Sequence, residues 1–533
     1  MNRSLVCAFI LAASACNAFG TDEPAATAPV SAVSADAGSD GPSPVNGVPG
    51  EADFSVSVAA GVTTVVQGVS AKFRVTIVRG SQLDGGVALS VTGLRAGLTV
   101  KTVTANGATA DLEISASPDA VQGDAAGMLE AKAGAISHSV AFKALVRGKP
   151  GAVDTTYGVD GNVSTLFGAK VRGTAIDLVV APDDSVYAVG NADDSNLATR
   201  VVHVDPGGKV DAAYGTSGRA TINIFAPHSA LLQPDGKLLL VGGNQPSNAA
   251  VGRLTTSGAP DPGFGNGTIG LGTQTLATGS LSGTNNGVTL AALRKDGDIF
   301  LAWDNADNGV TKNATMELAP NGQIRTAYAA GGAQRTAVGL TTGLAVRNDG
   351  TASDGKLAMF YVDSGTVYLQ QTNTLTLGYD PLFGGPKSVA LPGLTRSAAG
   401  PQGLVVLSDG SIVGAFRASD GVYLLKFTKV GAPGPGFGTG GVAGPYASPT
   451  GEPTGIAVQS DGKILVSYDT GGLTRLTAAG LPDDEFGDHG TVPATAPTTS
   501  ARRSVVQQKN GRILVSGERG ASLIDGSITA YWP

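Results

Sequence analysis

Cysteine, tryptophan, histidine and charged residues are all scarce in this chain of 533 residues. It has two cysteines, two tryptophans and four histidines, and 15% of its residues are charged, against about 25% in ordinary domains. Both cysteines, Cys7 and Cys16, lie near the start, so we expect no disulfide and no thiol chemistry in the remainder. The net charge of −7 provides no basic surface for phosphates, so we expect no nucleic-acid partner.

Glycine, in contrast, is abundant, with 78 residues, and 42% of the chain is apolar. That apolar content is enough to build cores, and no Gly-X-Y period is present, which excludes a collagen. The length is roughly three to four times that of a typical domain of about 150 residues. Together these features predict an all-β protein built from repeats.

Residues 1–16 have the pattern of an export signal: Arg3, an apolar run over 5–13, and small residues before Cys16. The run is too short for a membrane span, which needs about 20 apolar residues. Residues 11–16 resemble a bacterial lipobox, with Ala13 where Leu is usual, which implies a lipid anchor on Cys16. Cleavage after Gly20 is the alternative. Residues 17–52 are rich in Ala, Pro, Ser and Gly, which predicts a disordered tether.

Residues 53–148 show short alternating patterns typical of a sandwich. Apolar residues of one parity recur at Phe54, at Phe73 to Ile77, and at Leu112 and Ile114. The segments at 84–86 and 106–107 are turn signals of the kind that hairpins use, which predicts two hairpins. Residues 91–98 resemble a turn of Ig-like modules in bacterial surface proteins. We therefore expect an Ig-like β-sandwich here, and we expect a structural role for its lone histidine, His138.

An Asp-x-x-aromatic-Gly segment recurs along residues 151–533 at spacings of 49 to 64 residues. Two copies are degenerate: the one at Phe437 lacks the Asp, and the one at Tyr328 lacks both Asp and Gly. We expect a scaffold role, in which the Asp fixes a turn, the aromatic ring packs between repeats and the Gly adopts a tight backbone angle. The motif residues are Asp154, Tyr157, Gly158, Asp211, Tyr214, Gly215, Asp261, Phe264, Gly265, Asp380, Phe383, Gly384, Phe437, Gly438, Asp483, Phe486 and Gly487.

Between these copies a second motif recurs: an apolar strand, an Asp-Gly or Asn-Gly turn, and another apolar strand, as at 231–241. Such a unit cannot bury its own faces, so the copies must stack on one another. Seven copies predict a seven-bladed β-propeller over 151–533. The strand around 163–167 is expected to complete the last blade and close the ring, which leaves no open edge.

These segments resemble the delta-60 repeat, which is frequent in exported lipoproteins of deltaproteobacteria. The resemblance rests on Asp-x-x-Phe-Gly, on Gln-Pro-Asp-Gly-Lys at 233–237, and on Arg-Leu-x-x-x-Gly at 253–258. The repeats are also loosely similar to those of NHL-type propellers. The resemblance to the delta-60 repeat implies the propeller shape and a bacterial, myxobacterial-type lipoprotein, but no established reaction.

Few residues in the ring offer chemistry. His203, His228 and His489 lie in different repeats without a zinc-binding spacing, and the Asp runs at 183–184, 193–194 and 304–308 do not follow a calcium loop. We therefore expect no cofactor, no metal site and no catalytic residue. Neither the carboxylates nor any Gly-x-Ser-x-Gly segment indicates a hydrolase.

The sequence thus predicts an exported, lipid-anchored protein of the cell envelope, at the outer membrane or cell surface. We expect it to bind an unidentified protein or glycan through propeller loops, with the segment at 267–286 as the longest rim loop. The alternatives are an extracellular glycan- or cell-wall-acting enzyme with its site in the propeller funnel, and a purely structural coat protein.

Overall fold

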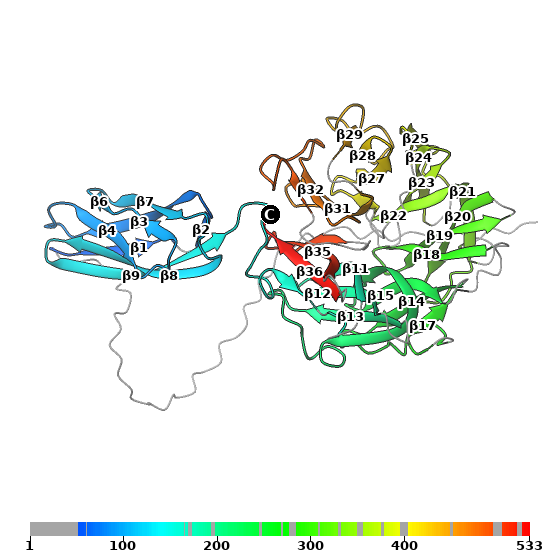
Figure 1. Ribbon diagram of the computed structural model, residues 1–533, viewed down its shortest axis with the longest axis horizontal. Helices are drawn as coiled ribbons and strands as arrows, with labels where there is room; N and C mark the ends of the chain where they lie inside the picture. Colours follow the sequence, from blue (N-terminus) through cyan, green and yellow to red (C-terminus); the bar gives the residue numbers. More distant parts are fainter. Residues whose placement is uncertain are drawn as a thin grey trace, which may run out of the picture. The chain divides into compact units, whose positions relative to one another are not determined.

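The computed structural model describes residues 52–59, 61–164, 166–168, 173–192, 198–244, 248–267, 270–276, 284–307, 310–328, 332–348, 355–374, 378–394, 403–447, 451–493, 504–519 and 525–533. All regular elements in these ranges are β-strands, as the sequence predicts (Figure 1). The export signal, Cys16 and nearly all of the expected tether lie outside the described residues.

The first nine strands form two sheets that face each other across one apolar core. One sheet has the order β1-β3-β7-β5 and the other β2-β9-β8-β4-β6. The pairs are antiparallel except for β2 with β9, which is parallel. The strands are β1 (Phe54–Val58), β2 (Thr63–Val66), β3 (Ser70–Arg79), β4 (Val87–Thr92), β5 (Leu98–Val100), β6 (Val103–Ala105), β7 (Thr109–Ala116), β8 (Gly123–Ala133) and β9 (Ile136–Arg147).

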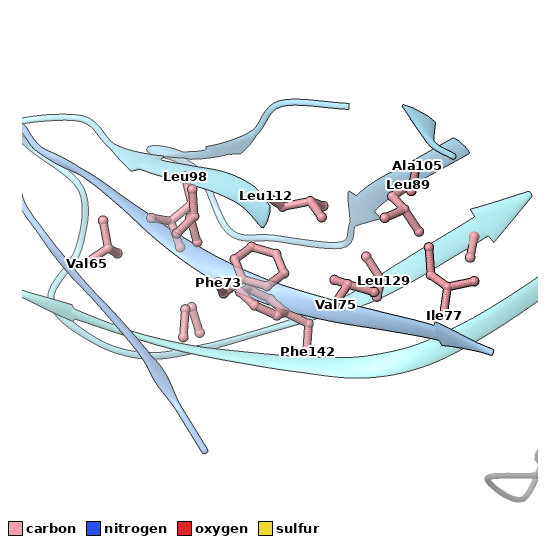
Figure 2. Close-up of a cluster of buried hydrophobic side chains, with 14 of the residues drawn as sticks. Val65, Phe73, Val75, Ile77, Leu89, Leu98, Ala105, Leu112, Leu129 and Phe142 are labelled. Atoms are coloured by element: carbon pink, nitrogen blue, oxygen red, sulfur yellow. The ribbon is translucent and has the colours of Figure 1, made fainter. Parts of the chain in front are cut away.

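Alternation along these strands produces the core, because successive side chains point to opposite faces of a sheet. Phe73, Val75 and Ile77 of β3 are buried, and the residues between them are exposed. Figure 2 shows them packed against Leu112 and Phe142. The parity read from the sequence is therefore confirmed for β3.

The sequence prediction of two hairpins in this region is wrong. The turn at 84–86 connects β3 with β4, and the turn at 106–107 connects β6 with β7, but in each case the two strands belong to different sheets. Turn residues show where the chain reverses, whereas the sheet that the next strand joins depends on where its apolar face is buried. The direct hairpin of the region joins β8 to β9 through residues 134–135.

Residues 162–531 form antiparallel sheets that follow one another around a closed, propeller-like ring (Figure 1). The sheet orders are β11-β12-β13-β14-β15-β16-β17, β18-β19-β20-β21, β22-β23-β24-β25, β26-β27-β28-β29, β30-β31-β32-β33 and β10-β36-β35-β34. In the seven-stranded sheet the first half of β14 pairs with β13 and its second half with β15. Contacts between inner strands run in a cycle through β11, β14, β18, β22, β26, β30 and β34 and back to β11.

The strand bounds in the ring are as follows. Those before residue 300 are β10 (Asn162–Val163), β11 (Gly173–Val180), β12 (Val186–Ala192), β13 (Ala198–Val204), β14 (Arg219–Leu232), β15 (Leu238–Asn244), β16 (Asn248–Leu254), β17 (Thr273–Thr275), β18 (Thr284–Leu293) and β19 (Ile299–Asp307). Those of the middle part are β20 (Val310–Leu318), β21 (Ala333–Val338), β22 (Leu340–Asn348), β23 (Gly355–Asp363), β24 (Thr366–Asn373), β25 (Lys387–Ala390), β26 (Leu404–Val406), β27 (Ile412–Ala418) and β28 (Gly421–Phe427). The last are β29 (Val442–Tyr446), β30 (Pro453–Val458), β31 (Ile464–Tyr468), β32 (Leu473–Leu476), β33 (Thr491–Val492), β34 (Val505–Gln507), β35 (Ile513–Arg519) and β36 (Asp525–Tyr531).

The two ends of the ring sequence share one sheet. Val163 of β10 pairs with Ile528 of β36, so an early strand completes the sheet of the last three. The strand is shorter than the expected 163–167: Leu166 and Phe167 are buried in the adjoining apolar cluster but lie outside the strand. The pairing removes the edge that β36 would otherwise expose.

The segment at 267–286 is not one long loop, contrary to the sequence prediction. Residues Thr273–Thr275 form β17, which pairs with β16, and β18 begins at Thr284. A stretch rich in Gly, Ser and Thr has weak intrinsic preferences, so the unpaired edge of β16 decides its structure.

The apolar cores of the ring lie between neighbouring sheets. One cluster, for example, joins Leu239 and Val241 of β15 to Leu301 and Trp303 of β19. Each sheet is apolar on both faces and needs a neighbour on each, which is the reason that repeats of this kind stack.

Candidate functional site

The repeated Asp-x-x-aromatic-Gly segment lies in a turn that leads into a strand, as between β13 and β14, between β16 and β17, and between β32 and β33. The Asp261 carboxylate accepts the N–H of Gly263 at 2.9 Å, and Asp483 accepts that of Glu485 at 3.3 Å. The same bond, to the N–H two residues further on, is made by Asp154, Asp211 and Asp380. A side-chain oxygen thus replaces a backbone acceptor in the turn.

The second oxygen of this carboxylate receives a cation from its own sheet. Arg253 Nε donates to Asp261 Oδ2 at 2.8 Å, and Lys237 Nζ lies 3.0 Å from the same atom. The Arg253 and Asp261 side chains are only 6% and 7% exposed, so this is a buried ion pair. Arg475 and Lys463 bind Asp483 in the same way, and Arg512 binds Asp154 at 2.6 Å.

The paired arginine also lies over the motif's aromatic ring. The Arg253 guanidinium carbon is 4.7 Å from the centre of the Phe264 ring, and that of Arg475 is 4.3 Å from the centre of Phe486. Burial raises the pKa of the Asp261 carboxyl. The Gly263 N–H and the charges of Lys237 and Arg253 outweigh burial, so the pKa falls below its ordinary value.

The glycine of the motif connects its repeat to a turn of the next repeat. Gly158 N–H donates to Gly207 O at 2.8 Å, in the turn that follows β13. Equivalent bonds join Gly215 to Ser257, Gly265 to Asn321, Gly438 to Ala479 and Gly487 to Pro150. The motif therefore attaches each of these turns to the neighbouring repeat.

The aromatic ring packs against the glycine of that same neighbouring turn. A Cβ atom on Gly322 would lie 2.8 Å from the Phe264 ring, and one on Gly208 would lie 2.4 Å from Gly158 N. A real Cβ does not approach so closely, so only glycine fits. Beside it, Gln233 Nε2 and Arg253 Nη1 both donate to Pro320 O, at 3.3 and 2.5 Å.

The repeat formed by β11, β12 and β13 carries a variant of this arrangement. Ser185, His203 and Asp211 stand at the positions of Lys237, Arg253 and Asp261. His203 Nδ1 lies 2.9 Å from Asp211 Oδ2, and Nε2 lies 2.9 Å from Ser185 Oγ. These distances are those of a serine-hydrolase triad.

The serine of this trio is nevertheless not activated. Its hydroxyl donates to Asp183 Oδ1 at 2.6 Å, so the proton points away from His203, and the residue is only 3% exposed. Tyr187 stacks on the imidazole at 4.6 Å between ring centres. The trio occupies the positions of the Lys, Arg and Asp link found elsewhere, rather than forming a nucleophile with its base.

The sheet that begins with β18 carries the same positions with the charges reversed. Arg294 replaces Gln233, and Asp298 replaces Lys237. Glu317 replaces Arg253, and Arg325 replaces Asp261. Arg294 contacts Asp298 at 2.5 Å and Glu317 at 3.3 Å, and Arg325 contacts Asp298 at 2.9 Å. Burial and a hydrogen bond with Asp298 raise the pKa of Glu317 to about 7.

The degenerate copy at Phe437 has Gly434 in place of Asp. A Cβ atom at 434 would lie 2.6 Å from the side chain of Lys426. The lysine stem therefore fills the space of the missing carboxylate, and its ammonium group lies 5.8 Å from the centre of the Phe437 ring.

The histidines singled out in the sequence do not come together. His138 lies 2.7 Å from Asp53, a partner that sequence reasoning missed. His203 belongs to the trio above, His228 lies in β14, and the His489 side chain is 85% exposed. Asp193 and Asp194 lie outside the described residues. Among the described residues, no three His, Cys, Asp or Glu side chains are placed to hold a metal ion.

Sequence reasoning also missed the cations that complete the repeated link. The available signal was spacing, because Arg253 and Arg475 each precede the motif Asp by eight residues. This separation of eight residues spans the turn between the strand that carries the arginine and the motif. The ion pair forms because the strand pairing brings the two side chains together. Arg512 has no such signal, since its partner Asp154 lies at the other end of the ring sequence.

No protein-family model matches the chain, and no curated protein does. Among solved structures, the Dos1 propeller is 8% identical, with 66% of this chain and 78% of that chain covered and a TM-score of 0.38. BamB from Moraxella catarrhalis is 14% identical, with coverage of 69% and 100% and a TM-score of 0.31. A quinonprotein alcohol dehydrogenase-like protein from Bacteroides thetaiotaomicron is 11% identical, with coverage of 90% and 99% and a TM-score of 0.27.

Within the part of the chain that the structure describes, no helix is long and apolar enough to cross a bilayer.

Proposed function

We propose that this protein is an exported lipoprotein of the cell envelope that acts as a non-catalytic binding or scaffold module. In this proposal the ring is a seven-bladed propeller of delta-60 repeats, preceded by an Ig-like sandwich. The cycle of inner strands from β11 to β34 and the two facing sheets of β1–β9 support these assignments. The anchor at Cys16 rests on the lipobox-like residues alone.

The observation that carries the binding role is a contrast between the inside of each repeat and its exposed end. The motif carboxylates, their cations and the glycine N–H groups bind one another or the next sheet, so they provide a rigid frame. The two residues between the Asp and the aromatic residue vary among the copies, from Ala-Ala after Asp211 to Asp-Glu after Asp483. A rigid frame that presents variable ends is suited to recognition.

A catalytic role has less support. The one trio with the geometry of a hydrolase directs its serine proton to Asp183. The remaining buried carboxylates of the motif are neutralised by arginine or lysine. These groups are committed to holding the ring together, and a binding function does not require them to react.

Affinity capture tests the binding role. The full chain with Cys16→Ser, which blocks lipidation, is immobilised and exposed to envelope extract and to a glycan panel. We expect a retained protein or glycan and no turnover of any panel member. Turnover of a glycan would reject the non-catalytic assignment, and the absence of any retained molecule would favour a purely structural coat protein.

Fractionation tests the anchor separately. We expect the unmodified chain to sediment with membranes and the Cys16→Ser variant to become soluble. A variant that still sediments would refute the lipid anchor but would leave the binding role open.

A further inference from the structure

A groove of about 470 Å³ lies beside the motif copy at 483–487. Its apolar lining consists of Tyr446, at the end of β29, and of Pro445, Ala447, Pro482 and Pro493. The Tyr446 hydroxyl donates to Gly480 O, so the ring is held in place from outside the groove. Aromatic and proline rings fixed in this way provide a flat apolar surface that loses little entropy on binding.

The exposed end of this copy is acidic, unlike that of the other copies. Asp484 and Glu485 stand between the motif Asp and Phe, where the other six copies have only uncharged residues. Asp488 follows and lines the groove. The Asp484 and Asp488 side chains are 81% and 89% exposed, so neither is needed for packing, and we call these three residues the acidic rim.

A metal ion does not explain the rim. Among the described residues no set of three acidic or histidine side chains converges. His489 instead lies 3.3 Å from Asp484 and 4.0 Å from Asp488, which leaves the net charge of the rim negative. The groove therefore has an apolar floor, the Asp488 carboxylate and the His489 imidazole in its lining, and Asp484 beside that imidazole.

We propose that this groove binds an extended segment of a partner protein through a lysine or arginine side chain. The aliphatic stem lies on the rings of Tyr446 and the prolines, and the cationic head reaches Asp484 and Asp488. Charge complementarity between the rim and a basic segment favours this occupant over a glycan. The inference rests on the proposed binding function and narrows its ligand to a basic peptide.

A peptide array tests the inference with the intact chain. The array carries hexapeptides with a central Lys, Arg, Gln or Glu and varied flanking residues, and the bound chain is detected through a tag. We expect peptides with Lys or Arg to be bound at least tenfold more than those with Gln or Glu. Raising the salt concentration from 50 to 500 mM is expected to weaken this preference, because exposed charges are screened.

One variant and a control locate the site. Asp484→Asn/Glu485→Gln/Asp488→Asn should remove the preference for basic peptides. The control Asp84→Asn/Glu113→Gln/Asp160→Asn makes the same charge change at exposed residues elsewhere and should bind as the unmodified chain does. Circular dichroism verifies that each variant is folded.

The outcomes separate this inference from the proposed function. Loss of the preference in the rim variant alone supports the inference. Absence of any preference for basic peptides, or equal loss in the rim variant and the control, overturns it. Calcium binding to the rim without peptide binding also overturns it. A partner or glycan captured equally by the rim variant would overturn the inference and leave the binding function intact.

Discussion

The buried ion pair of the repeated link makes a measurable prediction at Asp261. Replacing it with Asn keeps an oxygen that can accept the Gly263 N–H but removes the negative charge beside Arg253. The arginine side chain is 6% exposed and retains only neutral acceptors, Gln233 and the carbonyl of Pro320. A cation is then left buried without its counter-ion.

The expected loss follows from these contacts. Breaking a buried pair by removing one partner costs about 3–5 kcal/mol, and the two neutral acceptors place Asp261→Asn near the lower limit, at about 3 kcal/mol. Asp261→Ala also loses the hydrogen bond from the Gly263 N–H, which should lower the free energy of unfolding by about 1 kcal/mol more. In the double variant Arg253→Met/Asp261→Asn no buried arginine is left without a counter-ion. The loss in free energy of unfolding should therefore be about 1–2 kcal/mol smaller than for Asp261→Asn alone.

Urea unfolding measures these differences. The fully buried Trp303 belongs to the same apolar cluster as Phe264, so its fluorescence reports on these two sheets. The pKa of Asp261 is lowered in the folded protein, so its stabilisation is present above the ordinary value of about 3.9 and is lost as pH falls below it. Asp261→Asn should flatten that acid-side decline.

A charge-removing substitution at an exposed site serves as the control. Asp84→Asn, at an exposed position, should change the free energy of unfolding by less than about 0.5 kcal/mol. A loss below about 1 kcal/mol for Asp261→Asn, or equal losses for Asn and Ala, would show that the pair does not stabilise the link.

Three further predictions concern other parts of the ring. Glu317 has a pKa of about 7 in the folded protein, above the ordinary value of about 4.3. It therefore contributes a stability that is lost as pH rises from about 4 to 7, which lowers the urea midpoint over that range. Glu317→Gln should remove this contribution to the fall in urea midpoint. Gly208→Ala should lower the melting temperature more than Gly365→Ala, because both positions have positive φ but only the first Cβ meets backbone, at 2.4 Å; equal losses would refute the contact. Val163→Asp, at the buried strand that closes the ring, should cost about 3 kcal/mol or more in urea unfolding, whereas Val159→Asp, 77% exposed, should change little; a tolerated charge at 163 would refute the closure.

Much of the ring followed from sequence because its signals are local. The Asp-Gly turn at 235–236 predicts a hairpin, and Leu232 indeed pairs with Leu238 across it, with Gly236 at a φ of 79°. The pairing of an early strand with the last sheet also followed, because an incomplete last repeat requires a strand from the other end. In these cases the repeat itself contains the information about its neighbours.

The predictions failed where pairing depends on distant residues. The turns at 84–86 and 106–107 were placed correctly, but they lead to strands of the opposite sheet. The segment at 267–286 contains β17 because β16 offers it an edge. His138 lies beside Asp53, 85 residues away, a distance that no local pattern reveals.

The sequence by itself determined that the chain is all-β, that its second part is built from repeats, and where most of its hairpins turn. It did so because strand alternation and turn geometry are properties of a few adjacent residues. Only the tertiary structure decided which cation meets each motif carboxylate and which glycine receives each aromatic ring. Those contacts join separate strands or neighbouring sheets, so their geometry exists only once the ring has closed.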